Sequence, residues 1–260
     1  MSFLTKIVQL ILGKELNFQV GFIICGTQKG GTTALDYYLR LHPEICMANK
    51  KEVHFFDNDR NFLNQDPNYF AYHIHFNPKS VHEIIGEATP IYMYWNHVME
   101  RIRHYNPNIK LIVILRNPIH RAFSHWNMER DRKRENRTFW KAIQEEGIKN
   151  KTHNQNRTFS YIDRGFYSRQ IKEIYKYFEK EQLLILKNED LRNNPNIVLE
   201  KVAEFLSITA FEDIRHEEIH SRKYLSKINH REYEFLSLLY RNEIQDLENL
   251  LNWDLSSWSK

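Results

Sequence analysis

Three dense runs of apolar residues along the chain predict buried β-strands. They cover residues 20–26, 110–115 and 182–191. Runs this short, bounded by glycine or charged residues, are typical of strands that are covered on both faces of a sheet. A weaker run within residues 80–94 predicts a short strand that leads into Pro90, and residues 51–57 are expected to form a loop or a short strand.

Apolar residues at helical spacing fill most of the sequence between these runs. The predicted helices cover residues 35–42, 97–107, 120–130, 138–147, 165–178, 196–208 and 233–251. Asn117 is expected to cap the third of these helices, with Pro118 in its first turn. Strands that alternate with helices predict an α/β fold, in which a parallel sheet is flanked by helices on both faces.

The chain is expected to form a single domain over residues 1–260. Residues 1–18 carry apolar residues at helical spacing and predict an amphipathic helix that packs on this domain. The segment is too short and too interrupted for a membrane span, and it lacks the features of a signal peptide. Residues 131–160 are rich in charge and asparagine, and they are expected to form a surface excursion or a lid.

The composition is ordinary for a globular protein, since hydrophobic residues make up 42% and charged residues 27% of the chain. The formal net charge of +4 fits a local basic pocket for a small anion and does not predict binding to nucleic acid. Cys25 and Cys46 have no metal-binding or disulfide spacing, so we expect buried thiols in a reducing, cytoplasmic setting. No metal site is predicted, because the 13 histidines lack an acidic partner pattern.

The sequence GTQKGGTT, residues 26–33, joins the first predicted strand to a helix in the manner of a phosphate-binding loop. The ATP-type pattern G-x-x-x-x-G-K-[ST] has a lysine where this chain has Thr32, and the lysine here is Lys29. Gly30 and Gly31 let the backbone come close to an anion, and the free amides at the helix start favour negative charge. We therefore expect a ligand with a single phosphate at this loop.

The second predicted strand ends in a cation, where ATP-type proteins usually carry a magnesium-binding aspartate. Arg116 follows the apolar run directly, and Ser124 lies in the next helix. An arginine at a strand end and a serine on the following helix can converge on one phosphate. A ligand with one phosphate at the loop, another at Arg116 and no metal fits 3′-phosphoadenosine-5′-phosphosulfate (PAPS).

The segments GTQKGGTTAL and LRNPIHRAFSHW together resemble the cofactor-dependent sulfotransferases, most closely the carbohydrate type, such as heparan sulfate sulfotransferases, and bacterial relatives. The blocks KKEVHFFD and GEATPIYMY are also similar to family segments, and the resemblance spans about residues 20–258. It implies a sulfotransferase fold with a P-loop-like parallel sheet. It also implies an enzyme that moves a sulfonate group from PAPS to an acceptor hydroxyl by in-line transfer, leaving 3′-phosphoadenosine-5′-phosphate (PAP).

The resemblance implies roles for individual residues. Lys29 would contact the oxygen that bridges the phosphate and the sulfonate. Glu52 matches the catalytic base of the carbohydrate branch, and His54 could assist it or replace it. Arg116 and Ser124 would bind the 3′-phosphate. The residues expected around the 5′-phosphate are Gln28, Lys29, Gly30, Gly31, Thr32 and Thr33.

Two positions depart from the family pattern. Asn188 stands where the family often has the aromatic residue of Y-E-D-L. In the late basic segment SRKYLSK, Arg222 and Lys223 fit the family's R-K-G pattern and are expected to bind the cofactor, whereas Tyr224 replaces the glycine. Tyr224 could stack on the adenine, or the loop could differ altogether.

Two other functions stay open at this point: a nucleotide kinase-like phosphate-loop transferase, and a non-catalytic nucleotide-binding protein. The lack of a lysine at position 32 and of an acidic strand end counts against the first. Intact Lys29 and Glu52 count against the second. The acceptor is expected to be a small molecule, such as a natural product, or a carbohydrate, and the sequence decides neither between them nor on an oligomeric state.

Overall fold

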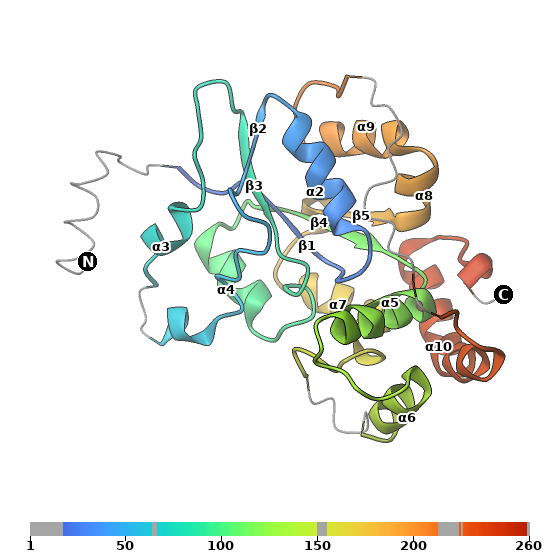
Figure 1. The fold of residues 1–260 in the computed structure, drawn as a ribbon. Coiled ribbons are helices and arrows are strands. Elements are labelled where there is room, and N and C mark those ends of the chain that lie inside the picture. The colour runs from blue at the N-terminus through green and yellow to red at the C-terminus, as the bar shows by residue number, and fades with distance from the viewer. Residues whose placement is uncertain (1–17, 64–66, 150–154, 213–223, 225, 259–260) are drawn as a thin grey trace.

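The structure is a computed structural model that describes residues 18–63, 67–149, 155–212, 224 and 226–258 (Figure 1). The amphipathic helix expected over residues 1–18 lies outside the described residues, apart from Phe18. Arg222 and Lys223, expected at the cofactor, also lie outside them. None of the helices in the described ranges is both long and apolar enough to span a bilayer.

Five strands in the described part of the chain form one parallel sheet, in the order β2-β3-β1-β4-β5. The strands are β1 (Phe22–Gly26), β2 (Ile45–Met47), β3 (Ile84–Ala88), β4 (Lys110–Leu115) and β5 (Leu183–Lys187). Because the strands run in the same direction, the loops that follow β1, β3 and β4 all leave one edge of the sheet. This edge carries the residues that were expected to bind phosphate.

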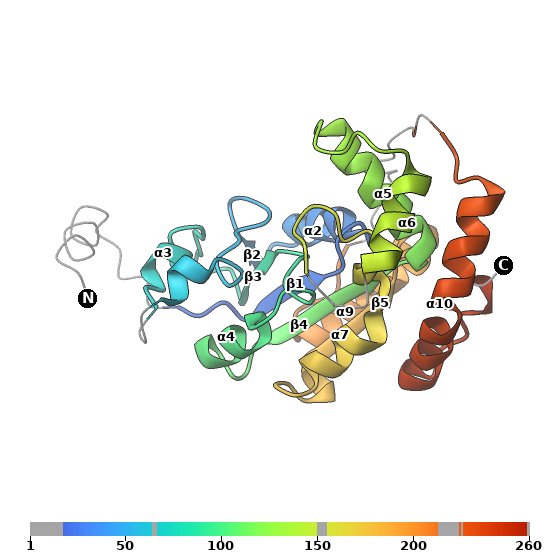
Figure 2. The same ribbon diagram turned by 90° about the horizontal axis from the view of Figure 1, so that it is seen from below.

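Alternate residues of each strand enter two separate hydrophobic cores, one on each face of the sheet. Phe22 and Ile24 of β1 pack in one core, and Ile23 and Cys25 pack in the other. Figure 2 shows α2 on one side of the strands, with α4 and α7 on the other. The predicted α/β fold, with a parallel sheet flanked on both faces, is therefore confirmed.

Two groups of helices cover the two faces of the sheet. The first core is closed by α2 (Thr32–Leu41), α8 (Asn188–Asn193) and α9 (Pro195–Leu206). The second is closed by α4 (Val98–Tyr105), α5 (Pro118–Asp131), α7 (Tyr167–Ile174) and α10 (His230–Leu251). The remaining helical segments of the described residues are α3 (Phe70–His73), α6 (Phe139–Lys149), η1 (Asp59–Phe62), η3 (Asp163–Gly165), η4 (Lys180–Gln182) and η5 (Ser256–Trp258).

The structure differs from the prediction at one strand and at several element ends. The three-residue strand β2 is too short to give a pattern and was not predicted. The strand predicted over residues 182–191 ends at Lys187, because the polar residues after it begin α8. Helix α6 continues past Gly147, which packs so closely on α10 that a Cβ there would lie 3.2 Å from the Phe235 ring.

Other local predictions are confirmed. The side chain of Asn117 accepts hydrogen bonds from the amides of Ile119 and His120, and Pro118 occupies the first turn of α5. Cys25 and Cys46 are both buried free thiols. Burial raises the pKa of Cys25 to about 12, so this thiol stays protonated and inert at neutral pH.

Candidate functional site

The loop between β1 and α2 is held by backbone hydrogen bonds and leaves the start of α2 open. The Thr27 amide donates to the Ile114 carbonyl of β4 at 3.1 Å, and the Gly30 amide donates to the Thr27 carbonyl at 2.9 Å. Gly31 is the N-cap, with φ 113°, and in the described structure no side chain caps this helix end. Among the described contacts, the first two amides of α2 make no hydrogen bond, so they are available to an anion, as the sequence predicts.

The two glycines of the loop are required by its packing as well as by any ligand. A Cβ on Gly30 would lie 2.4 Å from the Ile114 carbonyl oxygen. A Cβ on Gly31 would lie 2.3 Å from the side-chain nitrogen of Asn188, the residue that stands in place of an aromatic one. Asn188 is buried against the loop, so it supports the phosphate-binding turn directly.

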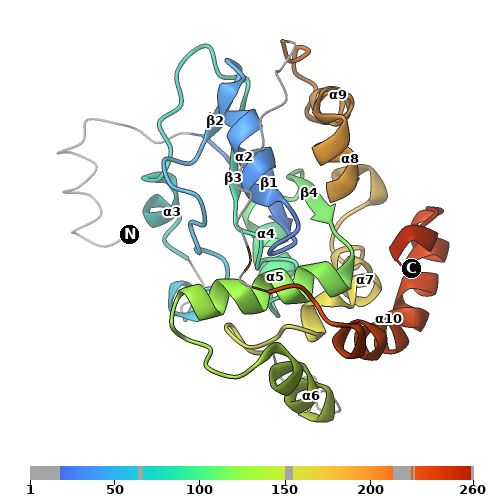
Figure 3. The same ribbon diagram turned by 45° about the vertical axis from the view of Figure 1, so that its right-hand side comes forward.

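Arg116 lies beside the loop, as expected for a residue at the end of β4. Its Nη1 donates to the Lys29 carbonyl at 3.4 Å. The Arg116 carbonyl in turn accepts a hydrogen bond from the hydroxyl of Tyr167 at 2.8 Å. Helix α5 crosses the same edge of the sheet near the start of α2 (Figure 3). The structure therefore brings Arg116 and Lys29 together.

Ser124 and Tyr224 meet on the exposed end of this region. Ser124 is buried on α5, and its hydroxyl accepts a hydrogen bond from the Tyr224 hydroxyl at 2.8 Å. The Tyr224 ring also stands edge-on to Phe123, with 5.5 Å between ring centroids. This contact orients Tyr224 at the predicted 3′-phosphate position, next to Ser124.

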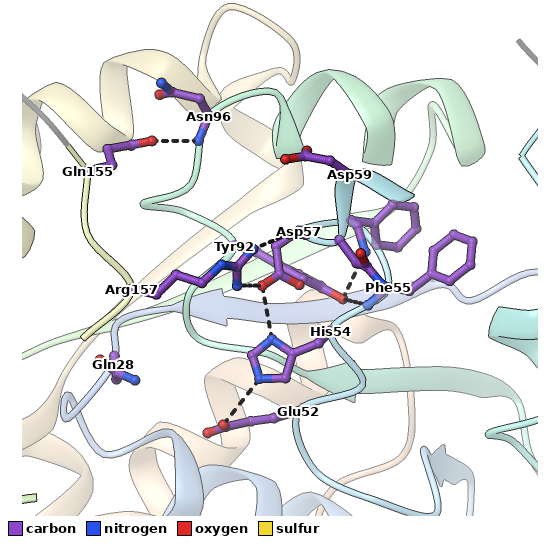
Figure 4. Close-up of polar contacts among 12 residues, drawn as sticks. Gln28, Glu52, His54, Phe55, Asp57, Asp59, Tyr92, Asn96, Gln155 and Arg157 are labelled. Atoms are coloured by element: carbon purple, nitrogen blue, oxygen red, sulfur yellow. Dashed lines mark hydrogen bonds and ion pairs between the residues drawn. The ribbon is translucent and has the colours of Figure 1, made fainter. Parts of the chain in front are cut away.

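A second polar cluster lies in the loop over residues 51–57, which follows β2 and contains no strand. His54 stands between two carboxylates (Figure 4). Its Nδ1 lies 3.0 Å from Asp57 Oδ2, and its Nε2 lies 3.6 Å from Glu52 Oε2. Lys51 Nζ lies 3.0 Å from the other Glu52 oxygen, and Arg157 pairs with Asp57 from the far side.

The charges of this cluster support one another. The hydrogen bond from His54, with help from Lys51, lowers the pKa of Glu52 to about 2. The bonds to Asp57 and then Glu52 raise the pKa of His54 to about 9. Burial acts to raise the pKa of Asp57, but the bonds from His54 and Arg157 outweigh it and lower that pKa. At neutral pH, His54 is therefore an imidazolium between two carboxylates.

Residues 86–94, the block GEATPIYMY, hold the backbone of this cluster through hydrogen bonds. The Tyr92 hydroxyl accepts hydrogen bonds from the amides of Phe55 (2.9 Å) and Phe56 (3.3 Å). Tyr92 also donates to Glu87, which further accepts bonds from two more hydroxyls. Glu87 is fully buried, and burial raises its pKa to about 7. Its role is to fix Tyr92, and so the backbone that carries His54.

The three residues predicted to be catalytic all have a left-handed backbone conformation. Lys29, Glu52 and His54 have φ values of 68°, 63° and 58°. Residues other than glycine seldom adopt this left-handed region, which costs about 1–2 kcal/mol each. Strained positions of this kind gather at active sites, where the surrounding structure imposes the conformation. Four further described residues away from the site share this conformation, so it is compatible with the predicted roles and does not by itself assign them; they are His97, Lys133, Ser207 and Asn252.

A cavity of about 430 Å³ opens beside His54. The residues that line it are His54, Asp57, Asn58, Asp59, Arg60, Trp95 and Arg157. Within the described residues, no group of three or more His, Cys, Asp or Glu side chains is placed to hold a metal ion. The site therefore combines an anion-binding loop, a strand-end arginine and an acid–base cluster next to a cavity.

Sequence reasoning did not single out several residues of this site. Asp57 ends the block KKEVHFFD, and its spacing of three from His54 was the only signal of its contact. Glu87 and Tyr92 fall in a block that was noted without a role. Arg157 reaches the cluster from a segment 100 residues away, so no local pattern pointed to it.

Comparison with known proteins shows the family of this chain. A family model described as "Sulfotransferase domain" matches residues 21–247. Human heparan sulfate glucosamine 3-O-sulfotransferase 5 is 33% identical over 187 residues, which cover 72% of this chain and 53% of that protein. Human bifunctional heparan sulfate N-deacetylase/N-sulfotransferase 2 is 30% identical and covers 73% of this chain and 22% of that protein. The chain thus spans about half the length, or less, of these curated relatives.

A solved structure matches almost the whole chain. The crystal structure of a sulfotransferase from Alicyclobacillus acidocaldarius superposes with a TM-score of 0.79 and 26% identity, covering 94% of this chain and 100% of that one. These matches agree with the resemblance seen in the sequence and do not favour a kinase-like transferase. The extent of the family match and the fold together show that this chain belongs to the sulfotransferase family.

Proposed function

We propose that this protein transfers a sulfonate group from PAPS to the hydroxyl of an acceptor, without a metal ion. The observation that carries the proposal is the contact of the Arg116 guanidinium with the Lys29 backbone, beside the open start of α2. An arginine next to open helix-start amides suits a ligand with separate phosphate groups. Arginine takes the place at which a metal-dependent transferase needs a carboxylate.

The residues around the loop fit a nucleotide with 5′- and 3′-phosphates. The first-turn amides of α2, with the hydroxyls of Thr32 and Thr33, would hold the 5′-phosphate. Arg116 and Ser124 would hold the 3′-phosphate, and Tyr224 would lie against it through Ser124. Arg222 and Lys223 stay proposed contacts from the same late segment. PAPS supplies the sulfonate that is transferred.

Lys29 and the acid–base cluster would divide the chemistry between them. Lys29 would stabilise the charge that develops on the departing phosphate oxygen, as fixed charges do in most group-transfer enzymes. Glu52 would take the proton of the acceptor hydroxyl. Its lowered pKa makes Glu52 a weak base at rest. His54, with its pKa raised to about 9, is already protonated at neutral pH, so it would hold and orient Glu52 rather than accept the proton itself.

The acceptor would enter through the cavity beside His54, which offers polar side chains and the edge of Trp95. A volume of about 430 Å³ suits a small molecule or a short carbohydrate segment. The relatives named for heparan sulfate favour a sugar hydroxyl. We therefore place a carbohydrate first and a small natural product second as the acceptor class.

Calorimetry with PAP in the presence of EDTA tests the donor assignment. We expect PAP to bind at least about tenfold more tightly than adenosine 5′-phosphate, because only PAP reaches Arg116 and Ser124. Arg116→Gln should remove that preference, while Lys141→Ala, an exposed lysine on α6, should leave it unchanged. Tighter binding of Mg-ATP than of PAP would contradict the proposal.

A further inference from the structure

Residues 155–164, here called the linking segment, touch both halves of the site. The segment runs from the end of the polar excursion to η3. At one end its Arg157 reaches the acid–base cluster, and at the other its Arg164 reaches the donor loop. The two contacts lie seven residues apart in the sequence, yet they serve loops that follow different strands.

Arg164 holds three separate pieces of backbone and side chain. Its Nη1 donates to the side-chain oxygen of Gln28 in the donor loop. Its Nη2 donates to the carbonyls of Asn156 (3.1 Å) and Arg157 (2.9 Å). The guanidinium lies 4.8 Å from the centre of the Tyr94 ring, and only 1% of the residue is exposed. Arg164 therefore fixes the backbone of Arg157 relative to the donor loop.

Arg157 carries the connection to the acid–base cluster. Its Nη1 donates to Asp57 Oδ2, the same oxygen that contacts His54, and its Nη2 donates to the Asp57 carbonyl. The guanidinium is stacked 4.2 Å above the Trp95 ring. Figure 4 shows Arg157 on the side of Asp57 away from Glu52, with Gln28 below it. The contacts form an unbroken series from Gln28 to His54.

The rest of the linking segment is anchored independently. One carboxylate, that of Glu146 on α6, accepts hydrogen bonds from three successive amides of the segment, at 2.7–2.9 Å. Near its start, Gln155 pairs with the backbone of Tyr94 and Asn96. These contacts hold the segment in one conformation, in which Arg164 bonds directly to the Arg157 carbonyl.

We propose that Arg164 is a positioning residue that couples the donor loop to the acid–base cluster through Arg157. The assignment of the loop to the donor rests on the proposed function; the contacts themselves do not. A purely structural role explains Arg164 poorly, because a buried charge is costly and its Nε has no hydrogen-bond partner among the described contacts. An apolar side chain would fill the same space more favourably.

The coupling can be measured at His54, whose protonation responds to the placement of Asp57. Charged groups face this imidazole from its own loop, from η1 and from the linking segment. They are Lys51, Glu52, Asp57, Asp59, Arg60 and Arg157. Since Arg157 competes with His54 for Asp57, any loss of the Arg157 contact should strengthen proton binding at His54.

The test is an NMR pH titration of His54 in the full chain without nucleotide, assigned by comparison with His54→Gln. Arg157→Gln should raise the proton-binding constant of His54 about threefold or more. Arg164→Lys keeps the charge but cannot make all three contacts, and it should give at least half of that shift in pH units. Gln28→Ala changes no charge, and it should also raise the proton-binding constant of His54. Arg241→Gln, an exposed arginine on α10, should leave the titration of His54 unchanged.

A shift with Arg157→Gln alone, or with none of the variants, would overturn the proposal. If Arg164→Lys does not fold, which circular dichroism would show, Gln28→Ala decides. Coupling is reciprocal, so Arg157→Gln should also weaken PAP binding by about threefold, although Arg157 lies outside the donor loop. If the wild type fails to bind PAP, the proposed function fails, and the His54 titration still decides the coupling.

Discussion

The proposed donor side and the acid–base side of this site are built in different ways. The proposed donor side is one continuous loop, residues 26–31, whose backbone is held by β4 and leads into the open start of α2. The acid–base side depends on charged side chains, Glu52, His54 and Asp57, and its outer partner Arg157 comes from 100 residues away. The loop is held by backbone hydrogen bonds, whereas the acid–base side is held by ion pairs between side chains.

This difference predicts how each half responds to change. A backbone cradle has no group that titrates near neutral pH, so substitutions on the donor side should act equally at every pH. A series of paired charges changes whenever one member gains or loses a proton. The acid–base side should therefore carry the pH dependence of the enzyme.

The largest effect is expected on the donor side, from Lys29→Ala. Loss of the charge that stabilises the departing oxygen should lower kcat/KM by roughly 10³-fold or more, at all pH values. Steady-state kinetics from pH 6 to pH 9 would measure it, with Lys141→Ala as a control for loss of a lysine. A loss of less than about tenfold would show that Lys29 does not act on the leaving group.

On the acid–base side, Glu52→Gln keeps the shape of the side chain and removes its ability to accept a proton. We expect kcat to fall by roughly 10²–10⁴-fold. His54→Ala should lower it less, by about tenfold, since it removes only the group that orients Glu52. If Glu52→Gln kept a near-normal kcat while His54→Ala lost it, the general base would be His54.

The pH profile of kcat also distinguishes Glu52 from His54 as the general base. With the pKa of Glu52 near 2, the carboxylate stays ionised and should give no acid limb between pH 5 and pH 8. Activity should fall as pH rises through about 9, where His54 loses the proton that bonds it to both carboxylates. His54→Gln should abolish this alkaline limb. A limb near pH 6–7 that His54→Gln removes would instead identify a neutral histidine base.

The smallest effect is expected on the free energy of unfolding, from Glu87, the buried carboxylate that bonds Tyr92 beneath the acid–base loop. Burial raises the pKa of Glu87 from 4.5 to about 7, so the folded state binds its proton more tightly than the unfolded state does. Stability from this group is present below pH 4.5 and lost as pH rises to 7. Glu87→Gln should therefore gain on the order of 2 kcal/mol relative to wild type between pH 5 and pH 8.

Urea unfolding of both proteins at the two pH values measures this change. The matched control is Glu83→Gln, which removes a carboxylate exposed just before β3. Its stability should change between pH 5 and pH 8 by the same amount as that of the wild type. An equal pH response in wild type and Glu87→Gln would mean that Glu87 titrates in the folded protein as it does when unfolded.

The contrast between the two sides also explains what the sequence could predict. The apolar runs of β1, β4 and β5 and the loop from Gly26 to Thr33 are local patterns, so the fold and the donor loop were predictable. Glu52 and His54 were found only through the resemblance. Arg157 and Arg164 were not found, because their contacts depend on how a polar excursion folds back on the sheet edge.

The proposed reaction is the transfer of a sulfonate group by the two sides together. Its most direct test is incubation of the protein with radiolabelled PAPS and a panel of hydroxyl acceptors or cell extract, in EDTA, followed by mass spectrometry of the labelled product. We predict a sulfonated product and release of PAP with the wild type, and neither with Lys29→Ala or Glu52→Gln. Binding of PAPS without any labelled product, or transfer that requires magnesium, would contradict this account.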